Sequence, residues 1–595
     1  MCGIAGVAVA NGEVKIDELT AMAQRQSHRG PDGMGAALAA AGHVGFAMNL
    51  LSIIDAAARP GPYRDAKTGT MIAYNGEIYN YTELAKRWGV ELRPGESDAQ
   101  VALQAYMRMG PECLSLFDGM FALAIYDPVR QHIFLARDRF GEKPLYYMLS
   151  ESRLIFASEV KALAVVEPLA PRFTPEWLSL ECPVASETPY EGVQLLEAGH
   201  YLILDLASWS IEKRCWWSIE ASRRRVPDDP RAVRDEFSSL LRRAAELRRG
   251  DASALMLSGG LDSAVLAFLL RPSVLLTVRY PGTSRYDESD LAWQVARSIG
   301  SDLVCIEPTE SDFRDHVMQI VEDLDYPMGN ASLFSERMLY RRAAEMGIRV
   351  VHGGIGPDEF LLGYVRHALA LDGPSAITSP ALSSYADLRK KFEVAATRRA
   401  SAADRYYRLI LRGPDPTSVT RLLVHQCFAR ARDLGQAVSL VDMATAFPPL
   451  LISSDKLASS HGIERRSPYL AHDWAELCFW LPLELKKQGS YTKRLLRDFA
   501  RELGVPRDIW SQVDKRGFAS PVPDWLRTTL ASWCDEQLTY LYQQDAPWFA
   551  HLIGGQATSP SSRFDRSRFH ALLISIWWQR QRETLPPAPA SLPTA

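Results

Sequence analysis

Apolar and polar positions alternate in short stretches along roughly the first 200 residues of the chain. Strands are expected at residues 4–9, 69–74, 121–126 and 132–136, because each stretch is apolar or alternating and lies near Gly, Pro or Asn. Helical patterns lie between them, for example at residues 97–109. This part of the chain is therefore predicted to be an α+β domain with stacked sheets.

The pattern changes from about residue 235 onward. Residues 252–257 form a short apolar run, 258–260 a Gly-containing turn, and 261–270 an apolar helix, with further apolar runs at 274–278 and 348–352. Strands that alternate with helices predict an α/β domain with a doubly wound parallel sheet. Beyond about residue 375 the pattern is mainly helical.

The boundaries follow from local composition. Residues 206–234 are polar and basic and contain Pro227 and Pro230, which is typical of a linker. We therefore expect one domain at 2–205 and another at 235–580. Residues 585–595 are rich in Pro and Ala and are expected to be a disordered tail.

Composition narrows the class of protein. A chain of 595 residues is too long for one hydrophobic core. Its net charge of −4 shows no excess of basic residues for binding a nucleic acid. The run Arg223–Arg225 stands beside two aspartates and is interpreted as a solvated linker. The eight cysteines form no CxxC pair, which indicates neither a zinc site nor a disulfide framework. Without a signal-peptide pattern or a membrane-spanning stretch, a cytoplasmic protein is expected.

The second residue is a candidate nucleophile. Removal of Met1 would leave Cys2 with a thiol and a free α-amino group, whose reference pKa values are about 8.5 and about 7.7–8.0. The amine could then act as base for its own thiol. A chance cysteine at this position is the alternative.

Further polar residues suit the chemistry of such a nucleophile. The Asn75 side chain and the Gly76 N–H group can form an oxyanion hole, since glycine lets the backbone approach a developing charge. Glu77 and Asp98 can hold a ligand's ammonium group. A hairpin turn is the competing interpretation of Asn75–Gly76.

The segment Ser258–Ser263 in the second part is a candidate anion site. It links an expected strand to an expected helix, where backbone N–H groups and the helix dipole favour pyrophosphate. The Walker A pattern is absent. A generic glycine turn is the alternative.

Taken together, the motifs MCGIAGV, HRGPDG, LSIID, NGEIYN, ESD, ARDRFGEKPLYY and FASEVKAL resemble the class II, Ntn-type glutamine amidotransferase domain of the asparagine synthetase family. The resemblance implies an Ntn-hydrolase-type sandwich, with Cys2 as nucleophile and Asn75 and Gly76 as oxyanion hole. It also implies that Glu77 and Asp98 bind the glutamine α-amino group, and it places Ile53 among the glutamine-binding residues.

The second part resembles the synthetase domain of the same family, which is of the PP-loop ATP pyrophosphatase type. This resemblance rests on SGGLDS, on VVHGGIGPDE followed by GY, on TKRLLR, and on the late motifs at 514–518 and 521–526. It implies ATP and Mg²⁺, with Asp262 and Asp358 as metal ligands and Lys493 neutralising the departing pyrophosphate. It further implies ATP or pyrophosphate contacts from Leu257, Ser258, Gly259, Gly260, Asp262, Ser263, Gly353 and Gly354.

The function implied is amide formation on a carboxylic acid through an acyl-adenylate, with ammonia from glutamine; the family also suggests a homodimer. The chain departs from the family at several positions. Leu50 replaces an Arg that grips the glutamine carboxylate, Ile355 replaces a Glu, Gly353 a Ser, and Ala471 an Asp. We therefore expect an acceptor less polar than aspartate, of the specialised-metabolite type. The alternatives are an ordinary asparagine synthase, an ammonia- or amine-dependent relative with a vestigial glutaminase domain, and a non-catalytic binding protein.

Overall fold

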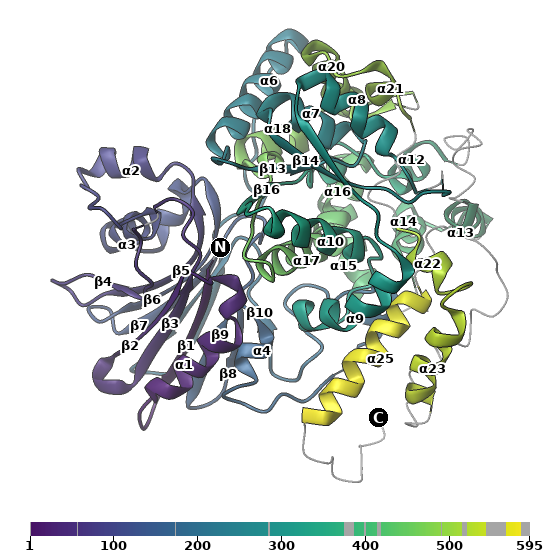
Figure 1. Ribbon diagram of the computed structural model, residues 1–595. Coiled ribbons are helices and arrows are strands. Elements are labelled where there is room, and N and C mark those ends of the chain that lie inside the picture. The colour runs from purple at the N-terminus through teal and green to yellow at the C-terminus, as the bar shows by residue number, and fades with distance from the viewer. Residues whose placement is uncertain are drawn as a thin grey trace.

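The protein is described by a computed structural model that covers residues 2–55, 57–172, 174–283, 286–373, 386–397, 400–412, 418–489, 491–513, 520–542 and 567–584. A sheet-rich first domain lies beside a larger second domain, in which helices predominate (Figure 1). Met1, the late motif at 514–518 and the expected tail at 585–595 lie outside the described residues.

Within this described chain the first domain contains two six-stranded antiparallel sheets, in the orders β10-β8-β9-β1-β3-β2 and β12-β11-β7-β6-β5-β4. The strands of the first sheet are β1 (Gly3–Val9), β2 (Gly33–Ala39), β3 (Val44–Leu50), β8 (Tyr146–Leu149), β9 (Arg153–Ala157) and β10 (Gln194–Leu195). Those of the second are β4 (Tyr63–Arg64), β5 (Met71–Ile78), β6 (Gly119–Asp127), β7 (His132–Arg137), β11 (His200–Asp205) and β12 (Ile211–Cys215).

The two sheets pack face to face because their side chains alternate. Ile4 and Ala8 of β1 join an inner cluster with residues of the other sheet, whereas Ala5 and Val7 face helix α1 (Ile16–Arg25). Helices α2 (Tyr81–Trp88) and α3 (Asp98–Met109) cover the outer face of the second sheet. The predicted α+β sandwich is confirmed as four layers, helix, sheet, sheet and helix.

The second sheet continues into the segment expected as a linker. Strand β12 pairs with β11 along its whole length, His200 opposite Cys215. Its side chains are exposed, and this polar edge strand resembles a linker in composition. Within the run at 223–225, Arg224 forms ion pairs with Glu236 and Asp473.

The second domain is built on a five-stranded parallel sheet of order β15-β14-β13-β16-β17. Its strands are β13 (Ala254–Met256), β14 (Val274–Val278), β15 (Asp302–Ile306), β16 (Val350–His352) and β17 (Glu464–Arg466). Leu255 packs with one helical layer and Met256 with the other, so the predicted doubly wound sheet is confirmed. The strand order reverses between β13 and β16, and ligand crevices form at such a point.

Helices cover both faces of this sheet and make up most of the described chain after residue 375, as predicted (Figure 1). The longer ones are α6 (Pro230–Leu247), α7 (Leu261–Leu270), α8 (Ser289–Ile299), α9 (Glu310–Leu324), α10 (Ser332–Glu345), α12 (Val365–Asp372), α13 (Ala386–Thr397), α14 (Ala402–Ile410), α15 (Ser418–Arg430), α16 (Leu434–Thr445), α17 (Phe447–Ser459), α18 (His472–Trp480), α20 (Arg494–Leu503), α23 (Ala531–Tyr542) and α25 (Ser567–Thr584). Shorter elements are α4 (Val160–Leu163), α5 (Pro175–Leu180), α11 (Pro357–Phe360), α19 (Leu483–Lys486), α21 (Arg507–Trp510), α22 (Val522–Trp525) and the strand pair β18 (Lys487–Gln488) and β19 (Tyr491–Thr492).

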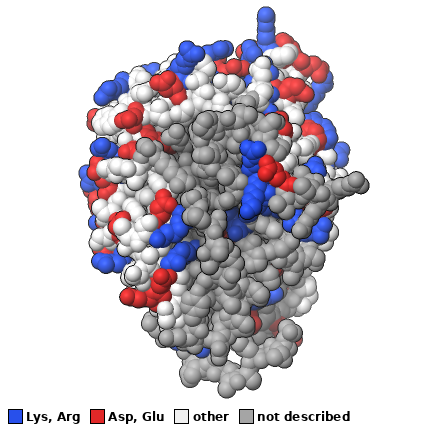
Figure 2. All heavy atoms as spheres, turned by 90° about the vertical axis from the view of Figure 1, so that its right-hand side faces the viewer, with Lys and Arg blue, Asp and Glu red and all other residues white. Residues whose placement is uncertain are grey.

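Three features of the described structure concern membrane insertion, the cysteines and the surface charge. Among the described residues, the segment Leu434–Ser459 is long and apolar enough to cross a membrane, but 67% of its apolar 18-residue window is buried within the protein, as in a core helix. All eight cysteines are described, and they are free thiols. On the face seen in Figure 2, blue basic and red acidic side chains are intermixed among the described residues.

Candidate active sites

The candidate nucleophile lies at the start of strand β1, between the two sheets. Cys2 is buried, its N–H group donates to Asn75 Oδ1 at 2.9 Å, and its carbonyl accepts from Arg29 Nε at 3.1 Å. Burial raises the pKa of the Cys2 thiol above its usual value. The thiol therefore needs a nearby proton acceptor to act as a nucleophile.

The candidate oxyanion hole lies inside strand β5. Asn75 pairs with Ala122 and Gly76 with Phe121, so the strand runs to Ile78 rather than ending at residue 74, and Asn75–Gly76 is not a hairpin turn. A Cβ atom on Gly76 would lie 2.2 Å from the Met120 carbonyl oxygen, which explains the glycine. Asn75 Nδ2 is buried and has no hydrogen-bond partner in the described structure. Such a donor is costly unless a ligand accepts from it.

The two candidate ammonium ligands differ in their surroundings. Asp98 accepts from the Tyr74 hydroxyl at 2.6 Å and from the Ile78 N–H group at 2.9 Å. Glu77 Oε2 instead accepts from Arg466 Nη2 at 2.6 Å, although Arg466 belongs to the second domain. Burial raises the pKa of both carboxyl groups, and Arg466 opposes that rise at Glu77.

Near the glutamine carboxylate position of the family, the chain presents amide and apolar groups. Leu50 is buried in the same apolar cluster as Cys2, and Ile53 is half-buried just after strand β3. The side chain of Asn49 is 1% exposed, and neither its Oδ1 nor its Nδ2 has a hydrogen-bond partner among the described residues. It lies against Gly3, where a Cβ would be 3.0 Å from Asn49 Oδ1. Asn49 was missed at the sequence level, where only its position before Leu50 could have indicated it.

The candidate phosphate loop follows strand β13. Leu257 is buried, Gly259 has a φ of +73°, and a Cβ there would lie 2.9 Å from the Glu288 carbonyl oxygen. The Ser258 N–H group donates to Ser263 Oγ at 3.2 Å, which closes the loop onto helix α7. Gly260 is the N-cap residue of this helix and has no side chain that could accept a hydrogen bond from its first N–H groups. The first N–H groups of α7 therefore remain suited to an anion.

Three charged residues predicted to act on ATP meet at this loop. Lys493 Nζ lies 2.6 Å from Asp262 Oδ2 and 2.7 Å from Asp358 Oδ1. A Cβ on Gly363 would lie 1.9 Å from Asp358 Oδ1 and 2.2 Å from Lys493 Cε, so this close approach depends on glycine. Burial lowers the pKa of Lys493, and Asp262 opposes that shift. Two carboxylates that face one cation fit a magnesium ion, which prefers oxygen ligands.

The neighbouring segment contains Gly354, a predicted phosphate contact, and two positions that depart from the family, Gly353 and Ile355. Gly354 lies against Asp262, with 3.3 Å between a hypothetical Cβ and Asp262 Cβ. Gly353 lies against the guanidinium of Arg465, which sequence reasoning missed. Ile355 is half-buried and its carbonyl accepts from Ser467 Oγ at 2.9 Å, while Ala471 is buried just before helix α18.

Two motifs of the first domain hold the domain interface. From HRGPDG, His28 Nε2 lies 2.9 Å from Glu159 Oε2, and Arg29 Nη1 donates to Glu159 Oε1 at 3.0 Å. Arg29 also reaches helix α17 of the second domain, with Nη2 2.7 Å from Asp455 Oδ2 and Nη1 2.9 Å from Ser459 Oγ. Because Arg29 also binds the Cys2 carbonyl, it connects the nucleophile to the second domain.

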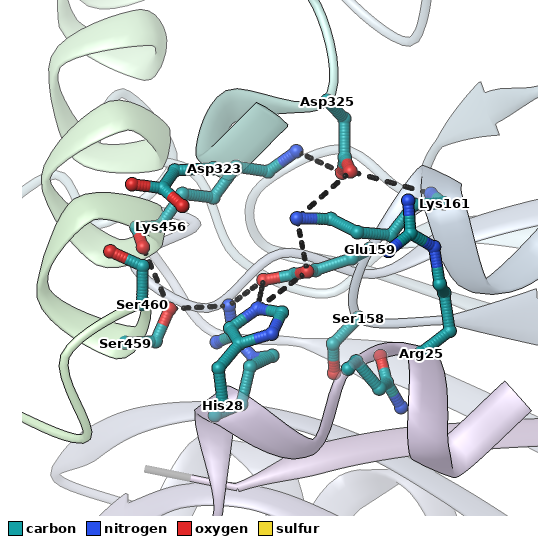
Figure 3. A network of polar contacts seen from close by, with 12 residues as sticks. Arg25, His28, Ser158, Glu159, Lys161, Asp323, Asp325, Lys456, Ser459 and Ser460 are labelled. Atoms are coloured by element: carbon teal, nitrogen blue, oxygen red, sulfur yellow. Dashed lines mark hydrogen bonds and ion pairs between the residues drawn. The ribbon is translucent and has the colours of Figure 1, made fainter. Parts of the chain in front are cut away.

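The network continues through FASEVKAL, as Figure 3 shows. Lys161 Nζ lies 3.0 Å from Glu159 Oε2 and 3.5 Å from Asp325 Oδ1. Lys456 Nζ is 2.5 Å from the other oxygen of Asp325. These groups are almost fully buried, and breaking such pairs is costly. The motif therefore supports the relative placement of the domains.

Comparison with known proteins agrees with this two-part construction. A model described as a glutamine amidotransferase domain matches residues 1–217, and one described as asparagine synthase matches residues 236–581. The chain belongs to the asparagine synthase family. It is thus a ligase that uses glutamine and ATP, and its first domain is a glutamine amidotransferase domain.

Individual relatives span most of the chain. A putative asparagine synthetase (glutamine-hydrolyzing) of Mycobacterium tuberculosis is 28% identical, covering 89% of this chain and 88% of its own length. Asparagine synthetase (glutamine-hydrolyzing) 2 of Bacillus subtilis is 28% identical over 84% of this chain and 69% of its own. Amidase chry2 of Gibberella zeae is 29% identical over 61% of this chain and 59% of its own.

Proposed function

We propose that this ligase amidates a specialised carboxylic acid, using ammonia released from glutamine at Cys2. In the second domain the acid's carboxylate oxygen attacks the α-phosphorus of ATP, and pyrophosphate leaves. Ammonia then attacks the acyl carbon of the adenylate, and AMP leaves with the amide product. The adenylation step is supported by one observation: Lys493 lies within ion-pair distance of Asp262 and Asp358 at the loop after β13.

The chain supplies a role for each proposed group. Asn75 Nδ2 and the Gly76 N–H group stabilise the oxyanion at the glutamine site. Such electrostatic stabilisation is usually the largest single contribution to catalysis. Lys493 stabilises negative charge on the departing pyrophosphate. Asp262 and Asp358 would hold Mg²⁺, which neutralises phosphate charge when it is bound.

The acceptor is inferred from the altered positions around the second site. Ile355 cannot pair with an ammonium group, and a buried ammonium without a partner is costly. Gly353 and Ala471 are small. These features favour an acid other than aspartate, and the similarity to amidases chry2 and chyE is in keeping with this. Asparagine synthetases among the relatives favour aspartate as the second candidate.

AMP formation tests the proposal. The purified protein, with Mg²⁺, ATP and glutamine, is offered aspartate and a panel of larger or less polar carboxylic acids. We expect a higher kcat/KM for one of these acids than for aspartate. The highest kcat/KM with aspartate would instead identify an ordinary asparagine synthase.

Two variants tie the activity to the assigned residues. Asp262→Ala and Lys493→Ala are expected to lose adenylation while glutamine hydrolysis persists, since the two reactions use separate sites. Asp498→Ala, at a half-buried position of helix α20, is the matched control. Normal AMP release by either site variant would contradict the assignment.

Leu50 favours a different nitrogen source. Without the family's Arg at this position, the first domain would be vestigial and the second would use free ammonia or an amine of the substrate. Amide formation with ammonium chloride but not with glutamine would support this alternative.

A further inference from the structure

Arg465 is a buried arginine whose guanidinium has no partner among the described residues. It is the central residue of strand β17 and is 7% exposed, yet no hydrogen bond or ion pair joins its side chain to any residue that the structure describes. Its neighbours Glu464 and Arg466 project from the opposite face of the strand, where they pair with each other. An uncompensated buried charge is costly, which indicates a group that awaits an anion.

The guanidinium lies against the segment that carries the synthetase site. A Cβ on Gly353 would be 2.6 Å from Arg465 Nη2 and 3.0 Å from its Nε. Any larger residue at position 353 would therefore displace the guanidinium. Gly353, found where the related family has a Ser, thus provides the space that Arg465 occupies.

The charged groups around Arg465 do not neutralise it directly. Glu336 on helix α10 accepts hydrogen bonds from Ser454 Oγ and the Tyr340 hydroxyl instead. Glu142 of the first domain has a pKa raised to about 8, by burial and by the charge of Asp138. His352 is held neutral, because burial and Arg466 lower its pKa to about 3. The positive charge of Arg465 is thus left available on the side of Gly353.

We propose that Arg465 binds a second anionic group of the acceptor acid, which is then a dicarboxylic acid without an ammonium group on that side. The inference rests on the proposed function and specifies its substrate class. Lys493 and the N–H groups of the phosphate loop are assigned to the ATP phosphates in the proposed function, so Arg465 is left for the acceptor. Ile355 replaces the carboxylate that would accompany an ammonium group, so the local charge favours an anion.

Matched pairs of acids test this assignment in the full-length protein. ATP–pyrophosphate exchange is measured with butanoate and succinate, pentanoate and glutarate, and hexanoate and adipate. Calorimetric binding of the same acids is measured with α,β-methylene-ATP and Mg²⁺. The diacid of at least one pair is expected to react or bind more strongly, and Arg465→Gln should reduce that preference by about 10–100-fold. The KM for ATP should stay unchanged.

Further variants separate binding from folding. Gly353→Ser keeps the arginine at position 465 but should lower the same preference, because the new Cβ displaces its guanidinium. Arg465→Lys keeps the charge but loses the planar fork, so a partial preference is expected. Arg501→Gln, at an exposed position on α20, is the control and should leave the preference intact.

The outcomes distinguish this inference from the proposed function. A wild-type protein that favours no diacid over its monoacid, a preference that survives in Arg465→Gln, or a raised KM for ATP alone would each overturn the inference. Diacid binding that depends on Arg465, in a protein that forms no AMP with any acid, would uphold it and contradict adenylation.

Discussion

Glu77 of the first domain and Arg466 of the second form an ion pair, with 2.6 Å between Oε2 and Nη2. The carbonyl of Arg466 accepts from the Gly353 N–H group at 3.0 Å, and the nearby Tyr469 hydroxyl donates to the Asp262 carbonyl at 2.8 Å. A proposed ligand of glutamine is thus connected through strand β17 and the residues that follow it to both segments proposed to bind ATP.

Replacing Arg466 with Met is expected to weaken glutamine binding. The pKa of Glu77 is already raised by burial and by Glu464, and loss of Arg466 would raise it further. A protonated Glu77 cannot attract the glutamine ammonium group, so the KM for glutamine should rise by about 10–100-fold at neutral pH. Since a carboxyl group ionises above its pKa, the KM should fall again as pH rises.

Glutaminase kinetics across a pH series measure this effect. Arg389→Met, which removes an exposed pair with Glu393, is the control. A KM in Arg466→Met that equals the wild-type value at every pH would show that Glu77 binds glutamine without help from the second domain.

Cys2→Ala is expected to abolish glutamine-supported amidation and to leave ammonia-supported amidation in place. Removal of a nucleophile costs a factor of at least about 1000 in turnover. Amide formation is measured with each nitrogen source. Cys113→Ala, which alters another buried thiol of the same domain, is the control. Equal loss with both sources would show a structural role for Cys2.

Leu50→Arg is expected to lower the KM for glutamine by about 10–100-fold, because a guanidinium can bind the substrate carboxylate through two hydrogen bonds. Leu50→Met tests the effect of side-chain shape alone and should leave the KM unchanged. An unchanged KM in the Arg variant, together with a raised KM in Asn49→Ala, would show that Asn49 already holds the carboxylate.

Glu142 gives a prediction for stability against pH. Its pKa is raised from 4.5 to about 8 by burial, so the folded state keeps a proton that the unfolded state releases. Stability from this group is present at low pH and is lost as pH rises from 4.5 towards 8, by about 1.4 kcal/mol for each pKa unit. The melting temperature of Glu142→Gln should therefore fall less than that of the wild type between mildly acidic and mildly alkaline pH.

Thermal melts at several pH values test this difference in slope. Glu151→Gln, at an exposed position of the same domain, should follow the wild-type curve. Parallel curves for Glu142→Gln and the wild type would contradict the raised pKa.

Local sequence was sufficient for the architecture and for part of each site. The strand, glycine turn and helix at residues 252–270 were predicted because their apolar periods and the turn chemistry are properties of neighbouring residues. The same holds for Cys2 at the start of a strand. The motif resemblance predicted that Asp262, Asp358 and Lys493 act at one ATP site. The structure places Lys493 within ion-pair distance of both carboxylates.

Tertiary structure alone decided how the parts connect. For Asn75–Gly76 the sequence left a hairpin turn open as the alternative to an oxyanion hole, and pairing with β6 shows that both residues lie inside strand β5. The pair Glu77–Arg466 joins residues 389 positions apart, and no local pattern predicts such a contact. At position 353 the sequence shows only that the family's serine side chain is absent. The structure shows that the guanidinium of Arg465 lies where a side chain at this position would be. Periodicity reports which face of an element is buried, whereas the partner across that face depends on the path of the whole chain.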